Sequence, residues 1–343
     1  MINRNSIAER DGGFARLALV AAAVTFGMII IGAITRVTGS GMGCGTDWPI
    51  CNGKVIPSFE GLQAAATVIE YGHRLFALIV GLVTAAVAVQ AFRLYRTVPR
   101  VFGLALLAVV LYFLQSALGA ITVRLSNEWL SVMLHLANSM LLLACFVLIW
   151  VSVRSYEHPL KNNSTGGVTL GAAIAASVFA FIVVLLGAVV AGNGALKACG
   201  DQLGMSWPLC LNTVWPANFG TLAELNMLHR IAAGILGLAL LLLALQAWRG
   251  PVNRLSRRAI LIAGTLYLTQ AAMGALVVLV EGTNQLIVVR SLHVTFSAAT
   301  WWAMVALSGV TWLQQFYRNN VTTVTTDRQL PKNSTVPSAI ISS

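Results

Sequence analysis

The sequence predicts an all-α integral membrane protein with eight transmembrane helices, arranged as two pseudo-symmetric four-helix bundles. Hydrophobic residues make up 57% of the 343 residues and charged residues only 10%, with a mean hydropathy of +0.80. Soluble domains carry about 25% charged residues, so the composition excludes that class. Eight long apolar runs follow one another along the chain, and short motifs recur about 155 residues apart.

Each apolar run can cross a bilayer, which takes about 20 mostly apolar residues. We expect the spans at roughly 14–36, 64–92, 101–123, 130–153, 168–192, 222–248, 256–280 and 290–316. The first run is longer than the core of a signal peptide, about 7 to 15 residues, so we expect this span to be retained.

These spans define five segments of the chain. They are a cytoplasmic N-terminus (1–13), a first four-helix repeat (14–154), a cytoplasmic linker (155–167), a second four-helix repeat (168–318) and a cytoplasmic tail (319–343). The tail is rich in Thr, Asn and Ser without periodicity, which predicts disorder.

Basic residues alternate between the loops. Most of the 22 Lys and Arg lie in the N-terminus, in the loops after the second, fourth and sixth spans, and in the tail. By the positive-inside rule, we expect a multi-pass protein of the cell membrane with both termini cytoplasmic. The net charge of +11 therefore reflects topology, and we expect the lipid membrane and no nucleic acid as a partner.

Two motifs support an internal duplication. Ile31-Gly32-Ala33 matches Leu186-Gly187-Ala188, and Gln115-Ser116-Ala117-Leu118-Gly119-Ala120 matches Gln270-Ala271-Ala272-Met273-Gly274-Ala275. Each repeat contains an even number of spans, so both halves share one orientation and are related by an axis along the membrane normal.

Four of the five histidines lie at matched places in the two halves, on even-numbered spans: His73, His135, His229 and His293. A histidine within a span usually faces the protein interior as a ligand, a proton carrier or a polar packing group. From the helical rise, we expect all four to lie roughly 5 to 15 Å beneath the outer surface. Each half thus presents two histidines on its second and fourth helices, the arrangement that ligates a haem iron from both sides.

Other interpretations of the histidines stay open. Zinc fits less well, because two histidines per half leave a tetrahedral site short of ligands. A transporter built from repeats, without any cofactor, is the main remaining option. The fifth histidine, His158, lies in a polar loop.

The two halves differ beside the first histidine of each pair. The first half reads Glu70-Tyr71-Gly72-His73-Arg74 and the second Asn226-Met227-Leu228-His229-Arg230. A carboxylate three residues before a histidine lies on the same helical face, where it could act as a general base, a proton acceptor or a stabiliser of a developing cation. With such a role, the Glu70 carboxylate would mark the first half as the reaction site. The alternative is that this carboxylate only forms a hydrogen bond or ion pair with a neighbouring group.

The arginines that follow the histidines allow two roles. Arg74 and Arg230 point about 100° round the helix from their histidines. They could pair with carboxylates, haem propionates included, or extend to the membrane interface.

Four cysteines lie in pairs in two outer loops, Cys44 with Cys51 and Cys199 with Cys210. The outer side is oxidising, so a local disulfide in each loop is one prediction. Free thiols or a redox-active pair are the alternatives. Cys145, in the fourth span, is expected to be a small core residue.

At these residues the sequence resembles the haem A synthase family over nearly the whole chain. The resemblance rests on Thr35-Arg36-Val37-Thr38-Gly39-Ser40-Gly41 leading to the first cysteine loop, on Glu70-Tyr71-Gly72-His73-Arg74 and His135, and on Leu228-His229-Arg230 and His293. Each motif is weak alone, but together, at this spacing on eight spans, they are specific.

The resemblance implies an enzyme that oxidises the C8 methyl group of its substrate haem O to a formyl group, by successive hydroxylations with oxygen from water. It implies that His73 and His135 bind haem O, that Glu70 takes part in the oxidation, and that His229 and His293 ligate a haem b cofactor. It further implies a disulfide between Cys44 and Cys51 near the substrate site. Implied partners are haem O synthase and the assembly of haem-copper oxidase. The alternative is a di-haem protein that exchanges electrons with quinone.

Overall fold

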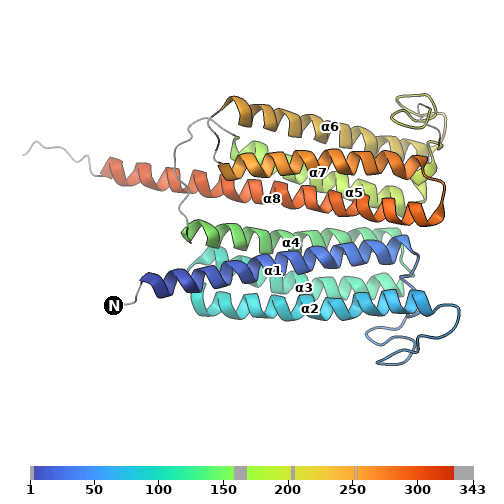
Figure 1. The fold of residues 1–343 in the computed structure, drawn as a ribbon, viewed down its shortest axis with the longest axis horizontal. Helices are drawn as coiled ribbons and strands as arrows, with labels where there is room; N and C mark the ends of the chain where they lie inside the picture. Colours follow the sequence, from blue (N-terminus) through green and yellow to red (C-terminus); the bar gives the residue numbers. More distant parts are fainter. Residues whose placement is uncertain (1–3, 158–167, 202–204, 251, 253, 328–343) are drawn as a thin grey trace, which may run out of the picture.

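The computed structural model describes residues 4–157, 168–201, 205–250, 252 and 254–327, and within these ranges it contains helices and no strands (Figure 1). The long helices are α1 (Arg4–Val37), α2 (Ala64–Tyr95), α3 (Pro99–Arg124), α4 (Trp129–Glu157), α5 (Leu170–Gly192), α6 (Thr221–Arg249), α7 (Arg254–Leu279) and α8 (Thr283–Asp327). A short 3-10 helix, η1 (Ala195–Lys197), follows α5. Each of the eight long helices described is long and apolar enough to cross a membrane, as predicted.

The terminal helices extend beyond the predicted spans. Helix α1 begins at Arg4, inside the segment predicted as a polar N-terminus, and α8 begins at Thr283 and continues to Asp327, inside the predicted tail. The thickness of the membrane sets the length of the apolar run, but the helix can continue beyond it. Neither extension contains a proline, which would interrupt the helix. Residues 158–167 of the predicted linker and 328–343 of the predicted tail lie outside the described residues.

The helices form two groups of four. Helices α1 to α4 pack on one another in the lower half of Figure 1, and α5 to α8 in the upper half. Contacts of α4 with α5 and of both α1 and α4 with α8 join the two groups. Half of the residues in the apolar windows of α4 and α8 are buried, more than in any other described span. These two helices therefore form the centre of the protein.

Large apolar side chains fill the centre. Phe146 and Met140 on α4, and Met304 and Leu307 on α8, are fully buried. The rings of Phe26 on α1 and Trp302 on α8 meet across the two groups, with their centroids 5.5 Å apart.

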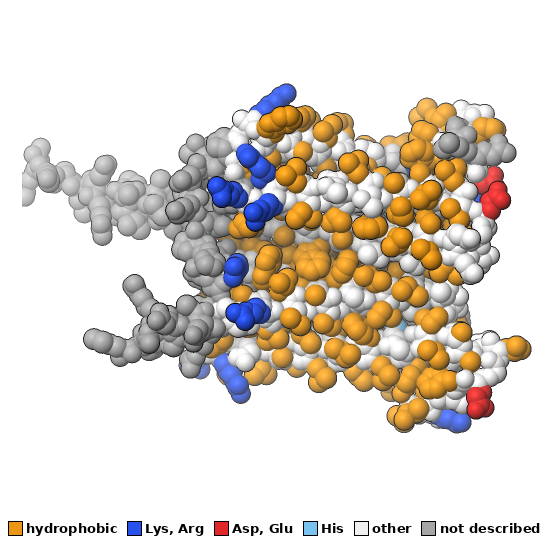
Figure 2. All heavy atoms as spheres, viewed as in Figure 1, with side chains coloured by type: hydrophobic (Ala, Val, Ile, Leu, Met, Phe, Trp, Pro, Cys, Tyr) orange, Lys and Arg blue, Asp and Glu red, His pale blue; other side chains and the backbone are white. Residues whose placement is uncertain are grey.

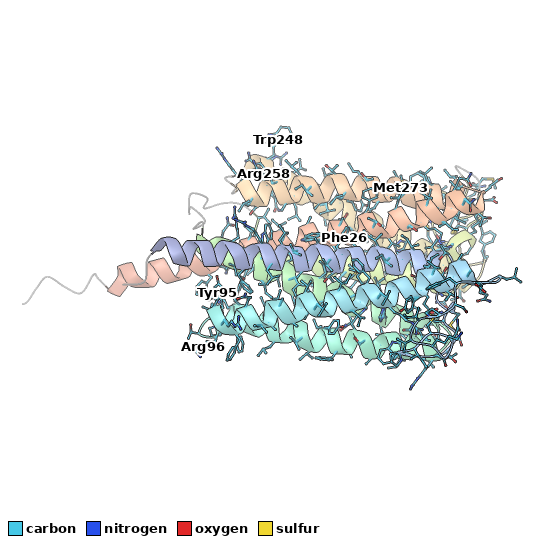
Figure 3. All side chains as sticks on the ribbon, turned by 60° about the horizontal axis from the view of Figure 1, so that its bottom comes forward. Phe26, Tyr95, Arg96, Trp248, Arg258 and Met273 are labelled. Carbon is cyan, nitrogen blue, oxygen red and sulfur yellow. A yellow bond between two sulfur atoms is a disulfide. The ribbon has the colours of Figure 1, made fainter. Side chains whose placement is uncertain are left out.

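Charged side chains segregate to the two ends of the bundle. Figure 2 shows most of the visible Lys and Arg at the end where the N-terminus lies, and Asp and Glu together with a few basic atoms at the opposite end. Arg96, after α2, and Arg258, on the first turns of α7, both lie at the basic end (Figure 3). The disulfide loops lie at the opposite end, where α1 and α5 finish.

A glycine sets the approach of the two groups near the disulfide loops. A Cβ atom added to Gly192, the last residue of α5, would lie 2.6 Å from Cβ of Trp129, the first residue of α4, and 3.4 Å from its Cα. Because these atoms lie on or next to the backbone, the helices would have to separate. Close packing of membrane helices through small residues is common.

Gly192→Ala should therefore lower the midpoint of thermal unfolding in detergent, because overpacking of this kind typically costs about 1 to 3 kcal/mol. The control is Gly171→Ala on the same helix, where an added Cβ meets nothing within 4 Å. Equal midpoints for the two variants would contradict the contact between α4 and α5.

Candidate functional site

The four paired histidines lie within about the first three turns of α2, α4, α6 and α8, at the end of the bundle that holds the disulfide loops. His73 and His135 are close enough to interact electrostatically, and so are His229 and His293. All four side chains are partly exposed. The structure thus brings together the two pairs that the sequence predicted. His158 lies outside the described residues.

Each paired histidine packs against a glycine of the preceding helix. The Cε1 atom of the imidazole lies 3.0 to 3.3 Å from the place where a Cβ on that glycine would be. The four contacts are Gly32 with His73, Gly119 with His135, Gly187 with His229, and Gly274 with His293. These glycines belong to the two repeated motifs, so the duplication repeats the surroundings of the histidines as well as the histidines.

The ring nitrogens are incompletely satisfied. Nδ1 of His73, His135 and His229 is buried without a hydrogen-bond partner, whereas Nδ1 of His293 lies 2.7 Å from the carbonyl oxygen of Gln270. Buried polar atoms without partners are costly and uncommon in folded proteins. Imidazoles left in this state fit a role in holding a group that the protein binds.

The donor set fits haem better than a protein-ligated metal ion. Among the described residues, no group of three or more His, Cys, Asp or Glu side chains could hold a metal ion. A tetrahedral zinc site needs three or four such ligands, whereas a haem iron needs only one axial nitrogen on each side. Two imidazoles per half meet that requirement.

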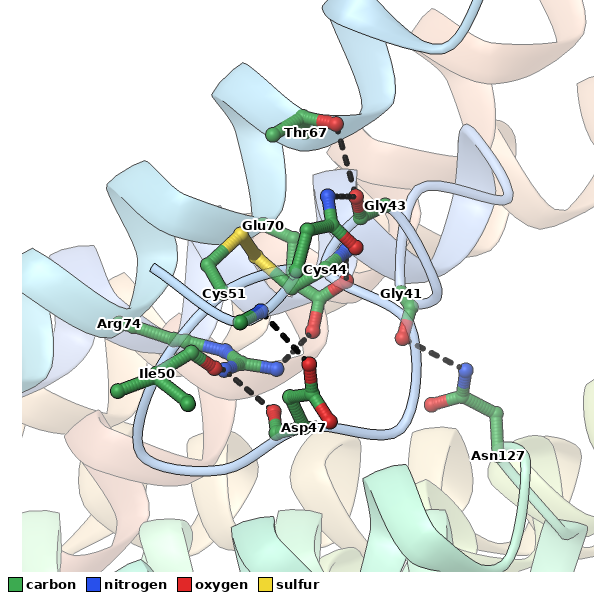
Figure 4. Close-up of polar contacts among 12 residues, drawn as sticks. Gly41, Gly43, Cys44, Asp47, Ile50, Cys51, Thr67, Glu70, Arg74 and Asn127 are labelled. Carbon is green, nitrogen blue, oxygen red and sulfur yellow. Dashed lines mark hydrogen bonds and ion pairs between the residues drawn. A yellow bond between two sulfur atoms is a disulfide. The ribbon is translucent and has the colours of Figure 1, made fainter. Parts of the chain in front are cut away.

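Glu70 links α2 to the first disulfide loop. Its side chain is buried, at 3% exposure. Oε2 accepts a hydrogen bond from the backbone N–H of Cys44 at 2.8 Å, and Oε1 pairs with Nη2 of Arg74 at 2.6 Å (Figure 4). Each oxygen of the carboxylate therefore has a hydrogen-bond partner.

Arg74 continues this contact into the loop. Its Nη1 donates to the carbonyl oxygens of Asp47 and Ile50, at 2.8 and 2.7 Å, on either side of the Trp48-Pro49 dipeptide (Figure 4). Of its two predicted roles, pairing with a carboxylate is confirmed, and the carboxylate is Glu70. The bonds to the loop carbonyls could not be predicted, because backbone acceptors leave no pattern in the sequence of side chains.

Two further bonds hold the first loop in place. Thr67 on α2 donates to the carbonyl oxygen of Gly43 at 2.8 Å, and Asn127, between α3 and α4, donates to that of Gly41 at 3.0 Å (Figure 4). The loop is therefore fastened both to α2, which carries His73, and to the turn that precedes α4, which carries His135.

The second half repeats the arginine contact but lacks the carboxylate. Nη1 of Arg230 donates to the carbonyl oxygens of Ser206 and of Leu209, the latter at 2.8 Å, and these residues flank Trp207-Pro208. Asn226 donates instead to the carbonyl oxygens of Ala195 and Leu196, at 2.6 and 3.1 Å. Nη2 of Arg230 is buried without a partner, at the place where Arg74 has Glu70.

Each loop is closed by a disulfide. Cys44 is joined to Cys51 and Cys199 to Cys210, with S–S distances of 1.99 and 2.01 Å. All four cysteines are buried. Cys145 is a free, buried cysteine on α4, as predicted.

Arg74→Gln should detach the first loop, because it removes the ion pair and the charged hydrogen bonds to two carbonyl groups, each worth about 1.5 to 3 kcal/mol. We expect Cys44–Cys51 to be reduced several-fold faster by a mild reductant, measured by alkylation of the released thiols. Cys199–Cys210 in the same molecule is the control and should keep its rate. Unchanged reduction of Cys44–Cys51 would show that Arg74 does not hold the loop.

Comparison with known proteins places this arrangement in one family. The model of the cytochrome oxidase assembly protein family, COX15-CtaA, matches residues 15–305. The chain is 32% identical over 270 residues to "Heme A synthase" of Exiguobacterium sp. (strain ATCC BAA-1283 / AT1b), covering 77% of this chain and 84% of that protein. It is 33% identical over 272 residues to "Heme A synthase" of Shouchella clausii, covering 78% and 87%. The chain therefore belongs to the cytochrome oxidase assembly family that includes the heme A synthases.

Proposed function

We propose that this protein is a haem A synthase, which oxidises the C8 methyl group of haem O to a formyl group by successive hydroxylations with oxygen from water. Family membership supports the activity. We assign the reaction site to the first half because of one observation. The carboxylate of Glu70 is buried near the first histidine pair, and the second half has the amide of Asn226 at the matching position.

The proposed reaction needs an electron acceptor and a proton acceptor. Converting a methyl group to a formyl group with one water removes four electrons and four protons. The Glu70 carboxylate, which is paired with Arg74 and accepts a hydrogen bond from the N–H of Cys44, could take up a proton or stabilise positive charge that develops at the methyl carbon. In this proposal Glu70 is the catalytic carboxylate.

The histidine pairs divide the binding roles. His73 and His135 would bind the substrate haem O in the half that holds Glu70. His229 and His293 would hold haem b, which supplies one-electron redox chemistry when bound. The neutral amide of Asn226, at the position of Glu70, suits a site that would keep its haem unchanged, because an amide does not take up a proton as a carboxylate does.

The proposed location is the cell membrane, with both termini in the cytoplasm. The gathering of Lys and Arg at the end where the N-terminus lies supports this orientation (Figure 2). The disulfide loops would then lie on the outer, oxidising side. Haem O synthase would supply the substrate, and the assembly of haem-copper oxidase would receive the product.

A second candidate is a di-haem electron-transfer protein. The glycine contacts shared by all four histidines favour it, because they make the two sites alike. The difference between Glu70 and Asn226 argues against it, since electron transfer alone needs no carboxylate in one site.

Glu70→Gln should retain bound haem but stop the formation of haem A, because the amide can still accept from Cys44 but cannot take up a proton. The measurement is acid-acetone extraction of the protein, purified from cells that make haem O, followed by chromatography of the haems. The control is Glu60→Gln, an exposed carboxylate in the loop between α1 and α2, which should leave haem A formation unchanged.

The extraction also separates the candidate functions. Haem b together with haem O, a hydroxylated haem or haem A in the wild-type extract supports synthesis. Haem b alone would favour the di-haem carrier. A normal yield of haem A from the Glu70→Gln variant would refute the catalytic role of the carboxylate.

A further inference from the structure

The second histidine of each pair is held differently in the two halves. In the first half, Nε2 of His135 lies 3.1 Å from the amide nitrogen of Gln115 on α3. In the second half, Gln270 occupies the position of Gln115 in the repeated motif. It accepts from Nδ1 of His293 through its backbone carbonyl, at 2.7 Å.

The hydrogen-bond network fixes the direction of the contact in the first half. Nδ2 of Asn138, a buried residue one turn after His135, lies 2.8 Å from the carbonyl oxygen of Leu111 and 2.7 Å from Oε1 of Gln115. A carbonyl oxygen can only accept, so Asn138 presents its NH₂ group to both. Gln115 therefore turns its own NH₂ group toward His135.

This orientation settles the tautomer of His135. An amide NH₂ group cannot accept a hydrogen bond, so Nε2 must hold the lone pair and Nδ1 the proton. The lone pair on Nε2 is the one that an iron would need. Gln115 thus prepares His135 as a ligand and occupies the lone pair at the same time.

The second half leaves the lone pair of its histidine clear of the glutamine side chain. The carbonyl of Gln270 can only accept, so Nδ1 of His293 carries the proton and Nε2 again has the lone pair. The side chain of Gln270 instead accepts a hydrogen bond from Ser297, at 2.5 Å. The residue at the position of Asn138 is Phe296, which has no polar group to turn the glutamine toward the histidine.

We propose that Gln115, oriented by Asn138, is a positioning residue that competes with the haem iron for Nε2 of His135, and so makes the haem of the first half exchangeable. The inference rests on the proposed function, in which the first half must release its product and the second must keep its cofactor. When haem is absent, the Gln115 amide donates to the lone pair of Nε2, which would otherwise be available to hold the iron. No proton moves, because the tautomer is already correct.

Removing the competitor should therefore slow the loss of haem. The experiment uses the full-length protein in detergent, carrying haem O and haem b, and follows transfer of each haem to an excess of apomyoglobin. In Gln115→Leu, haem O should leave roughly two- to tenfold more slowly than in the wild type, the factor that one net hydrogen bond provides. Asn138→Leu, which frees Gln115 to turn away, should slow the loss in the same direction.

Two controls separate this effect from a change in folding. Gln90→Leu makes the same substitution on α2, far along the chain from His73 and near the basic end, and should leave haem O loss unchanged. The haem b of each variant is the internal reference, because a folded second half keeps its haem.

The results distinguish failure of the proposed competition at His135 from failure of the proposed haem A synthase function. Unchanged or faster loss of haem O from both Gln115→Leu and Asn138→Leu, with haem b retained, would overturn the competition while leaving the proposed function intact. Failure of the wild type to bind haem O at all would contradict the substrate assignment itself, and the inference would fall with it.

Discussion

The contact between an imidazole ring and a glycine of the preceding helix is the constraint on which the rest of the structure depends. A histidine in a membrane span needs a polar partner or a function, and its ring needs space between helices packed closely enough to exclude lipid. Glycine provides that space, because even one methyl group at Gly187 or Gly274 would lie about 3.0 Å from the ring. The same solution at all four sites sets the distance between each odd-numbered helix and the next.

A shared framework with one altered residue explains how two similar halves can have different chemistry. Arg74 and Arg230 both hold the loop carbonyls that flank a Trp-Pro dipeptide. Only the first half adds a carboxylate to this contact, so Glu70 is tied to the loop and to the histidine helix at once. The two halves thus differ in the charge beside the histidine, while the arginine contacts to the loop carbonyls are the same in both.

The sequence was sufficient to predict the spans and the pairing of the histidines, because both depend on patterns that repeat along the chain. It did not predict the N-terminal end of α1 or the two ends of α8, since the apolar run that marks a span does not show where a helix begins or stops. It also left the arginines undecided between two roles. Their main partners are backbone carbonyls, and no residue pattern reveals those.

The roles of Gln115 and Asn138 lay equally beyond sequence reasoning. Gln115 and Gln270 occupy the same place in one motif, so the motif predicts like surroundings for His135 and His293. The difference arises from Asn138, three residues after one histidine, where the other half has Phe296. Its effect on the histidine passes through a second side chain, and such indirect contacts appear only when the helices are placed together.

The central claim is that one histidine pair holds the substrate and the other the resident cofactor. A cryo-electron microscopy map of the full-length protein supplied with haem O tests it most directly, because the isoprenoid chain of haem O distinguishes it from haem b. We expect haem O between His73 and His135, beside Glu70, and haem b between His229 and His293. Haem O in the second half, or haem b in both halves, would contradict it.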